Sequence, residues 1–87
     1  MDRKTRTTGD MAAERLARVK REFDSYSASI RLTELEAAAV LGQSVNTLKF
    51  WRLNKPGKGP AWIKANSSVR YAVGALREFQ NRAKQSA

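Results

Sequence analysis

Residues 32–52 read LTELEAAAVLGQSVNTLKFWR, and this stretch decides the fold of the chain. Thr33 is a good helix N-cap, and Glu36, three residues later, completes the sequence signature of a capping box. A helix is therefore predicted from Glu34 to Leu41, with acidic residues suited to its positive end. Gly42 is expected to end this helix, because glycine adopts a left-handed conformation without a Cβ penalty.

A second helix is predicted directly after this corner, from the N-cap Ser44 to about Leu53. One side of it is expected to be buried through apolar residues that recur at threes, namely Val45, Leu48 and Trp51. The other side is left to solvent and carries Ser44, Asn46, Thr47, Lys49, Phe50 and Arg52. An amide such as Asn46 can pair with an adenine edge, and Arg52 can pair with guanine or hold a phosphate.

A turn-rich segment and a β-hairpin are predicted to follow the second helix. Residues 54–60 contain two prolines and two glycines, which exclude regular structure there. Two extended segments, Ala61 to Ala65 and Val69 to Ala72, are joined by the turn residues 66–68, and a last helix is predicted from about Gly74 to Lys84. The predicted fold class is mainly α with a small β-hairpin. Two tryptophans are predicted to be core residues, Trp51 and Trp62, and three bases of the last helix are predicted to form a solvated face, Arg77, Arg82 and Lys84.

The N-terminal third has a different character. Residues 1–9 are polar and have no apolar periodicity, which predicts a disordered arm. A helix is predicted from Asp10 to about Ser25, and a serine-rich linker follows it to residue 29. This helix has one narrow apolar stripe, formed by Ala12, Leu16, Val19, Phe23 and Tyr26. The stripe is compatible with the seam of a homodimer and equally with docking against the rest of the chain.

The positive charge of the chain is concentrated in its second half. Its 87 residues carry a formal net charge of +9 at pH 7. The first 29 residues mix seven bases with five acids, whereas residues 37–77 contain no acid. This acid-free segment carries seven bases, namely Lys49, Arg52, Lys55, Lys58, Lys64, Arg70 and Arg77. It is therefore the part of the chain that we expect to meet a polyanion such as DNA.

The composition disfavours catalysis and metal binding. The chain has no cysteine and no histidine, which removes thiol nucleophiles, imidazole bases and the usual zinc ligands. Its eight acids are scattered, and no glycine-rich phosphate loop occurs. We therefore expect no enzymatic activity, no cofactor and no metal site. No apolar run is long enough to cross a bilayer, and the first residues do not read as a signal peptide, so a cytoplasmic, nucleoid-associated location and no membrane contact are expected.

One motif in the basic region resembles the centre of the winged helix-turn-helix of the MerR and excisionase-like superfamily, which includes small AlpA-type phage and mobile-element regulators: Leu41-Gly42-x-Ser44-x-x-Thr47-Leu48-x-x-Trp51. Residues 59–64 and 69–71 are similar to the wing strands of that family, and residues 76–79 to its closing helix. The sequence departs from the family at Gln43 and at the uncharged tip 66–68. The resemblance implies a winged helix-turn-helix DNA-binding domain over residues 30–87, with residues 10–29 as an extra N-terminal element.

The resemblance also implies which residues meet DNA. The second predicted helix would enter the major groove with Ser44, Val45, Asn46, Thr47, Lys49 and Phe50. The wing would meet the backbone or minor groove with Arg70, and Ser67 stands at its tip. Phosphate contacts are expected from Lys49, Arg52, Lys55, Lys58, Lys64 and Arg70. By its spacing alone, Phe50 is compatible with packing under the wing as well as with contact to DNA.

Three functions fit these features. The first is sequence-specific binding of double-stranded DNA for transcription regulation, by a homodimer or by copies side by side on repeated sites, since one small domain covers about one half-site. The second is an excisionase-like role, in which the protein bends DNA and works with a recombinase partner. The third is an adaptor whose basic face meets an acidic protein.

Overall fold

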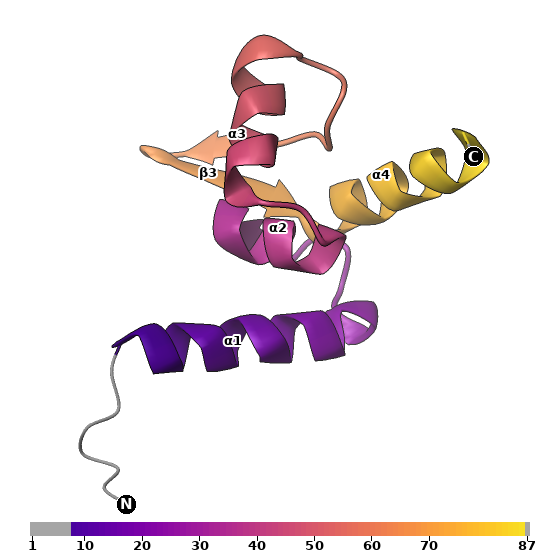
Figure 1. Ribbon diagram of the computed structural model, residues 1–87. Coiled ribbons are helices and arrows are strands. Elements are labelled where there is room, and N and C mark those ends of the chain that lie inside the picture. The colour runs from indigo at the N-terminus through magenta and orange to yellow at the C-terminus, as the bar shows by residue number, and fades with distance from the viewer. Residues whose placement is uncertain (1–7, 87) are drawn as a thin grey trace, which may run out of the picture.

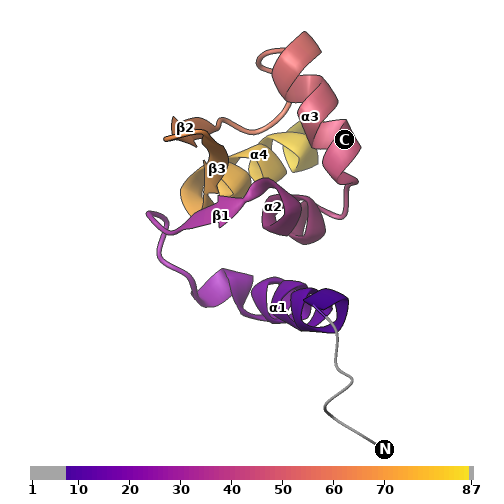
Figure 2. The ribbon, with the colours of Figure 1, turned by 90° about the vertical axis from the view of Figure 1, so that its left-hand side faces the viewer.

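The computed structural model describes residues 8–86 and has a mainly helical fold with a small antiparallel sheet (Figure 1). The elements follow in the order α1 (Thr8–Glu22), η2 (Phe23–Ser25, one 3₁₀ turn), β1 (Arg31–Thr33), α2 (Glu34–Leu41), α3 (Val45–Asn54), β2 (Ile63–Ala65), β3 (Ser68–Ala72) and α4 (Val73–Ser86). In both Figure 1 and Figure 2, α2 lies between α1 on one side and α3 on the other. The molecule therefore carries α1 and α3 on opposite sides.

The N-terminal helix starts earlier than predicted. α1 begins at Thr8, so Thr8 and Gly9 belong to the helix and not to the predicted arm, whose residues 1–7 lie outside the described residues. Asp10, the predicted N-cap, stands in the first turn of α1. An acidic residue is as favourable in the first turn as at the cap, because both lie at the positive end of the helix. The sequence pattern therefore did not fix the start of this helix.

The ends of α2 follow the local signals in the sequence. Thr33 Oγ1 accepts a hydrogen bond from the Glu36 N–H at 3.1 Å, and Glu36 Oε1 accepts one from the Thr33 N–H at 2.9 Å, which confirms the predicted capping box. Gly42 adopts the left-handed conformation, with a φ of 70°. The N–H of Gln43 then bonds to the carbonyl of Ala38 at 3.0 Å, which closes the end of α2. The predicted corner between two helices is present.

The sheet has one strand more than the predicted hairpin. β2 and β3 form that hairpin around Asn66 and Ser67, although β2 begins only at Ile63. β1 pairs with the other edge of β3, so the strand order is β1-β3-β2. In this pairing Leu32 lies opposite Tyr71. β1 is too short to show an alternating pattern by itself, and its partner strand is far along the chain, so the sequence did not predict it.

The core draws residues from α1, η2, the paired strands β1 and β3, and the helices α2, α3 and α4. Its buried apolar members are Val19, Phe23, Leu32, Ala37, Ala38, Leu48, Tyr71, Val73 and Leu76. Ala37 and Ala38 are small, which lets neighbouring backbone approach α2 closely. Val19 and Phe23 belong to the apolar stripe of the N-terminal helix. Of the two interpretations of that stripe, the structure shows docking against the rest of the chain.

Arg77 joins the end of α1 to α4. Its Nη2 donates hydrogen bonds to the carbonyl oxygens of Phe23 at 3.3 Å, Asp24 at 3.3 Å and Tyr26 at 2.6 Å, and its guanidinium lies 5.5 Å from the centre of the Phe23 ring. The prediction that Arg77 belongs to a solvated face is therefore wrong, whereas Lys84 is exposed. The sequence did not predict this contact, because the backbone carbonyl groups come close to Arg77 only when α1 docks on the rest of the chain.

Replacing Arg77 by alanine should lower the free energy of unfolding by about 2 kcal/mol, because charge-assisted hydrogen bonds to backbone carbonyls are lost. Urea denaturation at neutral pH measures this. Arg18→Ala, on the exposed side of α1, is the matched control and should change the free energy by less than about 0.5 kcal/mol. Equal effects of the two substitutions would contradict a specific role for Arg77.

Candidate nucleic-acid interface

One face of α3 is exposed to solvent. It consists of Asn46, Lys49, Phe50 and Leu53, all of them exposed, and we call it the α3 outer face. These positions follow one another at three- and four-residue intervals, so they form a single stripe along the helix. The stripe exists because Leu48 is buried on the opposite side, with Val45 and Trp51 packed beside it against the core. The structure thus brings together three predicted site residues, Asn46, Lys49 and Phe50.

The residues at the start of α3 have structural roles. Ser44 Oγ accepts a hydrogen bond from the Thr47 N–H at 3.0 Å, and the hydroxyl groups of the two residues lie 2.9 Å apart. Val45 is half-buried against the core. Ser44 and Thr47 therefore cap the helix, and Val45 holds it to the domain. Ser44, Val45 and Thr47, which were expected to enter the major groove with Asn46, are therefore engaged in contacts within the protein.

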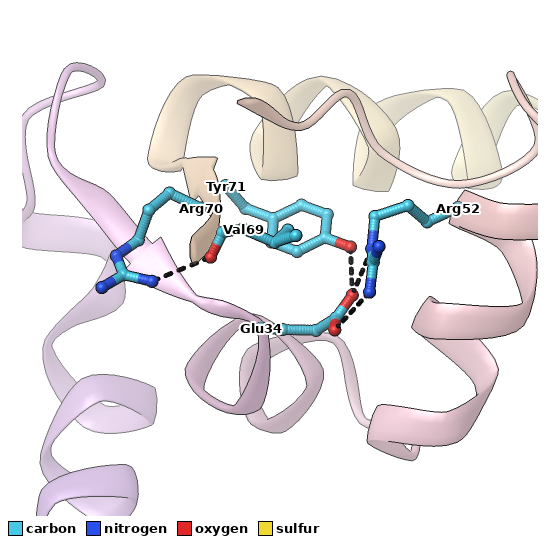
Figure 3. A network of polar contacts seen from close by, with 5 residues as sticks. All are labelled: Glu34, Arg52, Val69, Arg70 and Tyr71. Carbon is cyan, nitrogen blue, oxygen red and sulfur yellow. Dashed lines mark hydrogen bonds and ion pairs between the residues drawn. The ribbon is translucent and has the colours of Figure 1, made fainter. Parts of the chain in front are cut away.

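Arg52 turns away from the outer face and pairs with Glu34 of α2 (Figure 3). Its Nε lies 3.0 Å from Glu34 Oε2 and its Nη2 lies 3.0 Å from Oε1, in a two-pronged ion pair. Only 14% of each of the two side chains is exposed. The geometry does not support the prediction that Arg52 contacts a guanine or a phosphate, because the two nitrogens that would form such a fork are occupied by the carboxylate.

Tyr71 completes this network from β3. Its hydroxyl donates a hydrogen bond of 2.7 Å to Glu34 Oε2, so one carboxylate links α2, α3 and β3 (Figure 3). Burial raises the pKa of Glu34, but the hydrogen bonds from Arg52 and Tyr71 outweigh it, and the net pKa lies below the ordinary 4.5. Burial, together with the bond to Glu34, raises the pKa of the Tyr71 hydroxyl. The network is therefore ionic at neutral pH, with Tyr71 neutral.

The other predicted basic residues lie on several elements: Lys49 on the outer face itself, Lys55 and Lys58 after or at the end of α3, Lys64 on β2 and Arg70 on β3. Lys49, Lys55, Lys58 and Lys64 are exposed. Lys58 lies above the Trp51 ring, with its Nζ 5.8 Å from the ring centre. Arg70 is half-buried and its Nη1 donates to the Val69 carbonyl at 2.9 Å, so it is held along β3 (Figure 3). Ser67 is exposed at the hairpin tip beside Asn66, which has a φ of 58°.

The two tryptophans flank a hollow of about 320 Å³ behind α3. Trp51, a predicted core residue, is only partly buried: it packs against the edge of the core, and its ring lies 5.7 Å from that of Phe79. A Cβ on Gly59 would lie 2.8 Å from Trp51 Cε3, so only glycine fits there. Trp62 is 41% exposed, which makes the prediction that it is a core residue wrong. Its ring is covered on one side by Arg52, whose guanidinium lies 5.5 Å from the ring centre.

The sequence analysis missed Glu34 and Tyr71 as partners. The local sequence pattern predicted only that Glu34 stands near the positive end of a helix, where an acidic side chain is favourable. The sequence offered one signal, a pair of acids, Glu34 and Glu36, just before a long acid-free basic segment, but it did not indicate which of the two has a basic partner.

Within residues 8–86, no cluster of three acidic or other metal-ligating side chains is present, and no helix is long and apolar enough to span a bilayer. No family model matches the sequence, and no curated protein matches it either.

The ion-pair network makes the free energy of unfolding depend on pH. Because the pKa of Glu34 is lowered by folding, its stabilisation is complete above pH 4.5 and is lost as the pH falls through the lowered value. Glu34→Gln should therefore reduce the free energy of unfolding by about 1–3 kcal/mol at pH 7 and flatten its decrease below pH 4.5. Urea denaturation between pH 7 and pH 3 measures both effects. Tyr71→Phe should show a smaller change in the same direction, and an unchanged pH slope in Glu34→Gln would contradict this assignment.

Proposed function

We propose that this chain binds double-stranded DNA sequence-specifically through a winged helix-turn-helix and acts as a transcriptional regulator. In this proposal α2 and α3 form the helix-turn-helix, α3 is the recognition helix and the β2–β3 hairpin is the wing. The observation that carries the proposal is the α3 outer face, an exposed helix face with an amide and a lysine in an acid-free, basic segment.

The charge around the outer face favours a polyanion. Glu36 and Glu78 border this segment in the sequence. Glu36 is engaged in the capping box of α2, and the charge of Glu34 is compensated by Arg52 at 3.0 Å. The exposed side chains of Lys49, Lys55 and Lys64 have no such acid in their own segment. Lysines of this kind can hold phosphates on both sides of a groove and fix the position of a helix within it.

Asn46 is the residue best placed to read a base. It is exposed, it lies in the first turn of α3, and side chains near the start of a recognition helix are those that meet base edges. Its amide offers the donor and acceptor that match adenine N7 and N6. Arg52 has a positioning role in this proposal, because it sets the angle of α3 against α2.

A single copy presents one α3 and covers about one half-site, so regulation requires several copies on one operator. In the structure the apolar stripe of α1 is buried in the core through Val19 and Phe23. We therefore propose that copies bind side by side on repeated sites and do not meet through that stripe.

Salt dependence tests the phosphate contacts. The affinity for duplex DNA should fall steeply with salt, and Lys55→Ala should reduce the slope of log affinity against log salt by about 0.9. Lys20→Ala removes an equal charge from the exposed side of α1, across the molecule from α3 (Figure 1), and should leave the slope unchanged. Fluorescence anisotropy over a salt series measures both. An affinity independent of salt would exclude this mode of DNA binding.

Selection of sites from random duplex DNA tests the reading helix. The full chain should select a motif that contains an adenine, and Asn46→Ala should lose about 1–3 kcal/mol of discrimination at that one position. The remaining positions should stay selected, because the phosphate contacts and the fold are intact. If Asn46→Ala selected the same motif with the same strength, α3 would not be the reading element.

A further inference from the structure

Phe50 lies at the centre of the α3 outer face with half of its side chain in solvent. Its exposed fraction is 51%, although the core of the same helix is only two residues away at Leu48. Two residues correspond to about 200° around a helix, so no change of rotamer brings the ring into the core. The apolar ring therefore belongs to the surface that carries Asn46 and Lys49.

The position of Phe50 along the helix matches the spacing of bases. It follows Asn46 by four residues, which advances about 6 Å along α3 and keeps both side chains on the same face. Bases along one strand of DNA are about 3.4 Å apart, so the two side chains span about two base steps. A helix that places the Asn46 amide against an adenine thus places the Phe50 ring one or two base pairs away.

Among the four bases, thymine alone offers an apolar group at the floor of the major groove, its 5-methyl group. A phenylalanine has no hydrogen-bonding atom with which to read any other base edge. Leu53 is still more exposed, at 67%, but it lies a turn further from the N-terminal end of α3, away from the part of a recognition helix that meets bases. Phe50 is therefore the apolar reader that this face contains.

We propose that Phe50 selects thymine through its 5-methyl group, within about two base pairs of the adenine paired with Asn46. This inference rests on the proposed function, since it assigns a specificity-determining role within the same interface. It predicts a target that is rich in A·T pairs at its centre, and it explains why an aromatic ring is left in solvent beside an amide and a lysine.

Replacement of thymine by uracil tests this proposal, because it removes only the methyl group. The probe is the duplex selected by the full chain, synthesised with thymine or with uracil at each position. For the wild-type chain, one uracil should weaken binding about fourfold, the loss expected for one buried methyl group. Phe50→Ala should bind both duplexes equally. Leu35→Ala is the matched control, because Leu35 is 49% exposed on α2 and lines the hollow between α1 and α2.

The outcomes separate the two proposals. Equal binding of the thymine and uracil duplexes by the wild-type chain would overturn the role of Phe50 while leaving DNA binding intact, as would a selected site without thymine near the adenine. The same fourfold loss in Phe50→Ala would overturn it as well, since another residue would then read the methyl group. If the wild-type chain bound no duplex, the proposed function itself would fail, and with it the role of Phe50.

Discussion

The carboxylate of Glu34 is the point on which this small domain depends. It accepts two hydrogen bonds from Arg52 and one from Tyr71, and so connects the start of α2 with α3 and with the central strand. The buried residues of α2 are the small Ala37 and Ala38, although the core also holds larger side chains such as Tyr71, so α2 has few side-chain atoms with which to fix its crossing angle with α3. The directional, partly buried hydrogen bonds of Glu34 with Arg52 and Tyr71 fix this angle. The orientation of α3, and hence everything on its outer face, follows from this contact.

The same contact divides the basic residues into two kinds. Arg52 is held inside the domain by an acid, and Arg77 is held by backbone carbonyls at the end of η2. The lysines carry no fork of donors that would match a carboxylate or several carbonyls at once, and they remain at the surface. In the acid-free segment, Arg52 and Arg77 therefore build the structure, while Lys49, Lys55, Lys58 and Lys64 give its exposed surface positive charge.

The features that were predicted from the sequence depend on neighbouring residues, whereas those that were missed depend on residues far apart in the sequence. The capping box at Thr33, the left-handed Gly42 and the Ser44 cap are local signals, and the helices they bound were predicted to the residue or nearly so. The strand β1, the Glu34 network and the contacts of Arg77 require partners distant in sequence, and no local pattern contains them. The candidate site divides in the same way. Asn46 and Lys49 were predicted to face solvent from helical periodicity and do so, and of the two placements left open for Phe50 the structure shows the exposed one. Arg52 and Trp62 were misplaced because only the tertiary structure sets their neighbours.

The antiparallel pairing of β1 with β3 also governs how the domain is assembled. Arg31 pairs with Ala72, so the residues just before α2 and just before α4 close a loop that contains α2, α3 and the whole hairpin. The helix pair can form early from its own caps, but its apolar side is sealed only when this long-range pairing closes. The stretch from Leu32 to Arg52 is consequently not a transplantable module. Moved to another scaffold, α2 and α3 would arrive without Tyr71, and the helix that carries Asn46 would have no fixed direction in which to point.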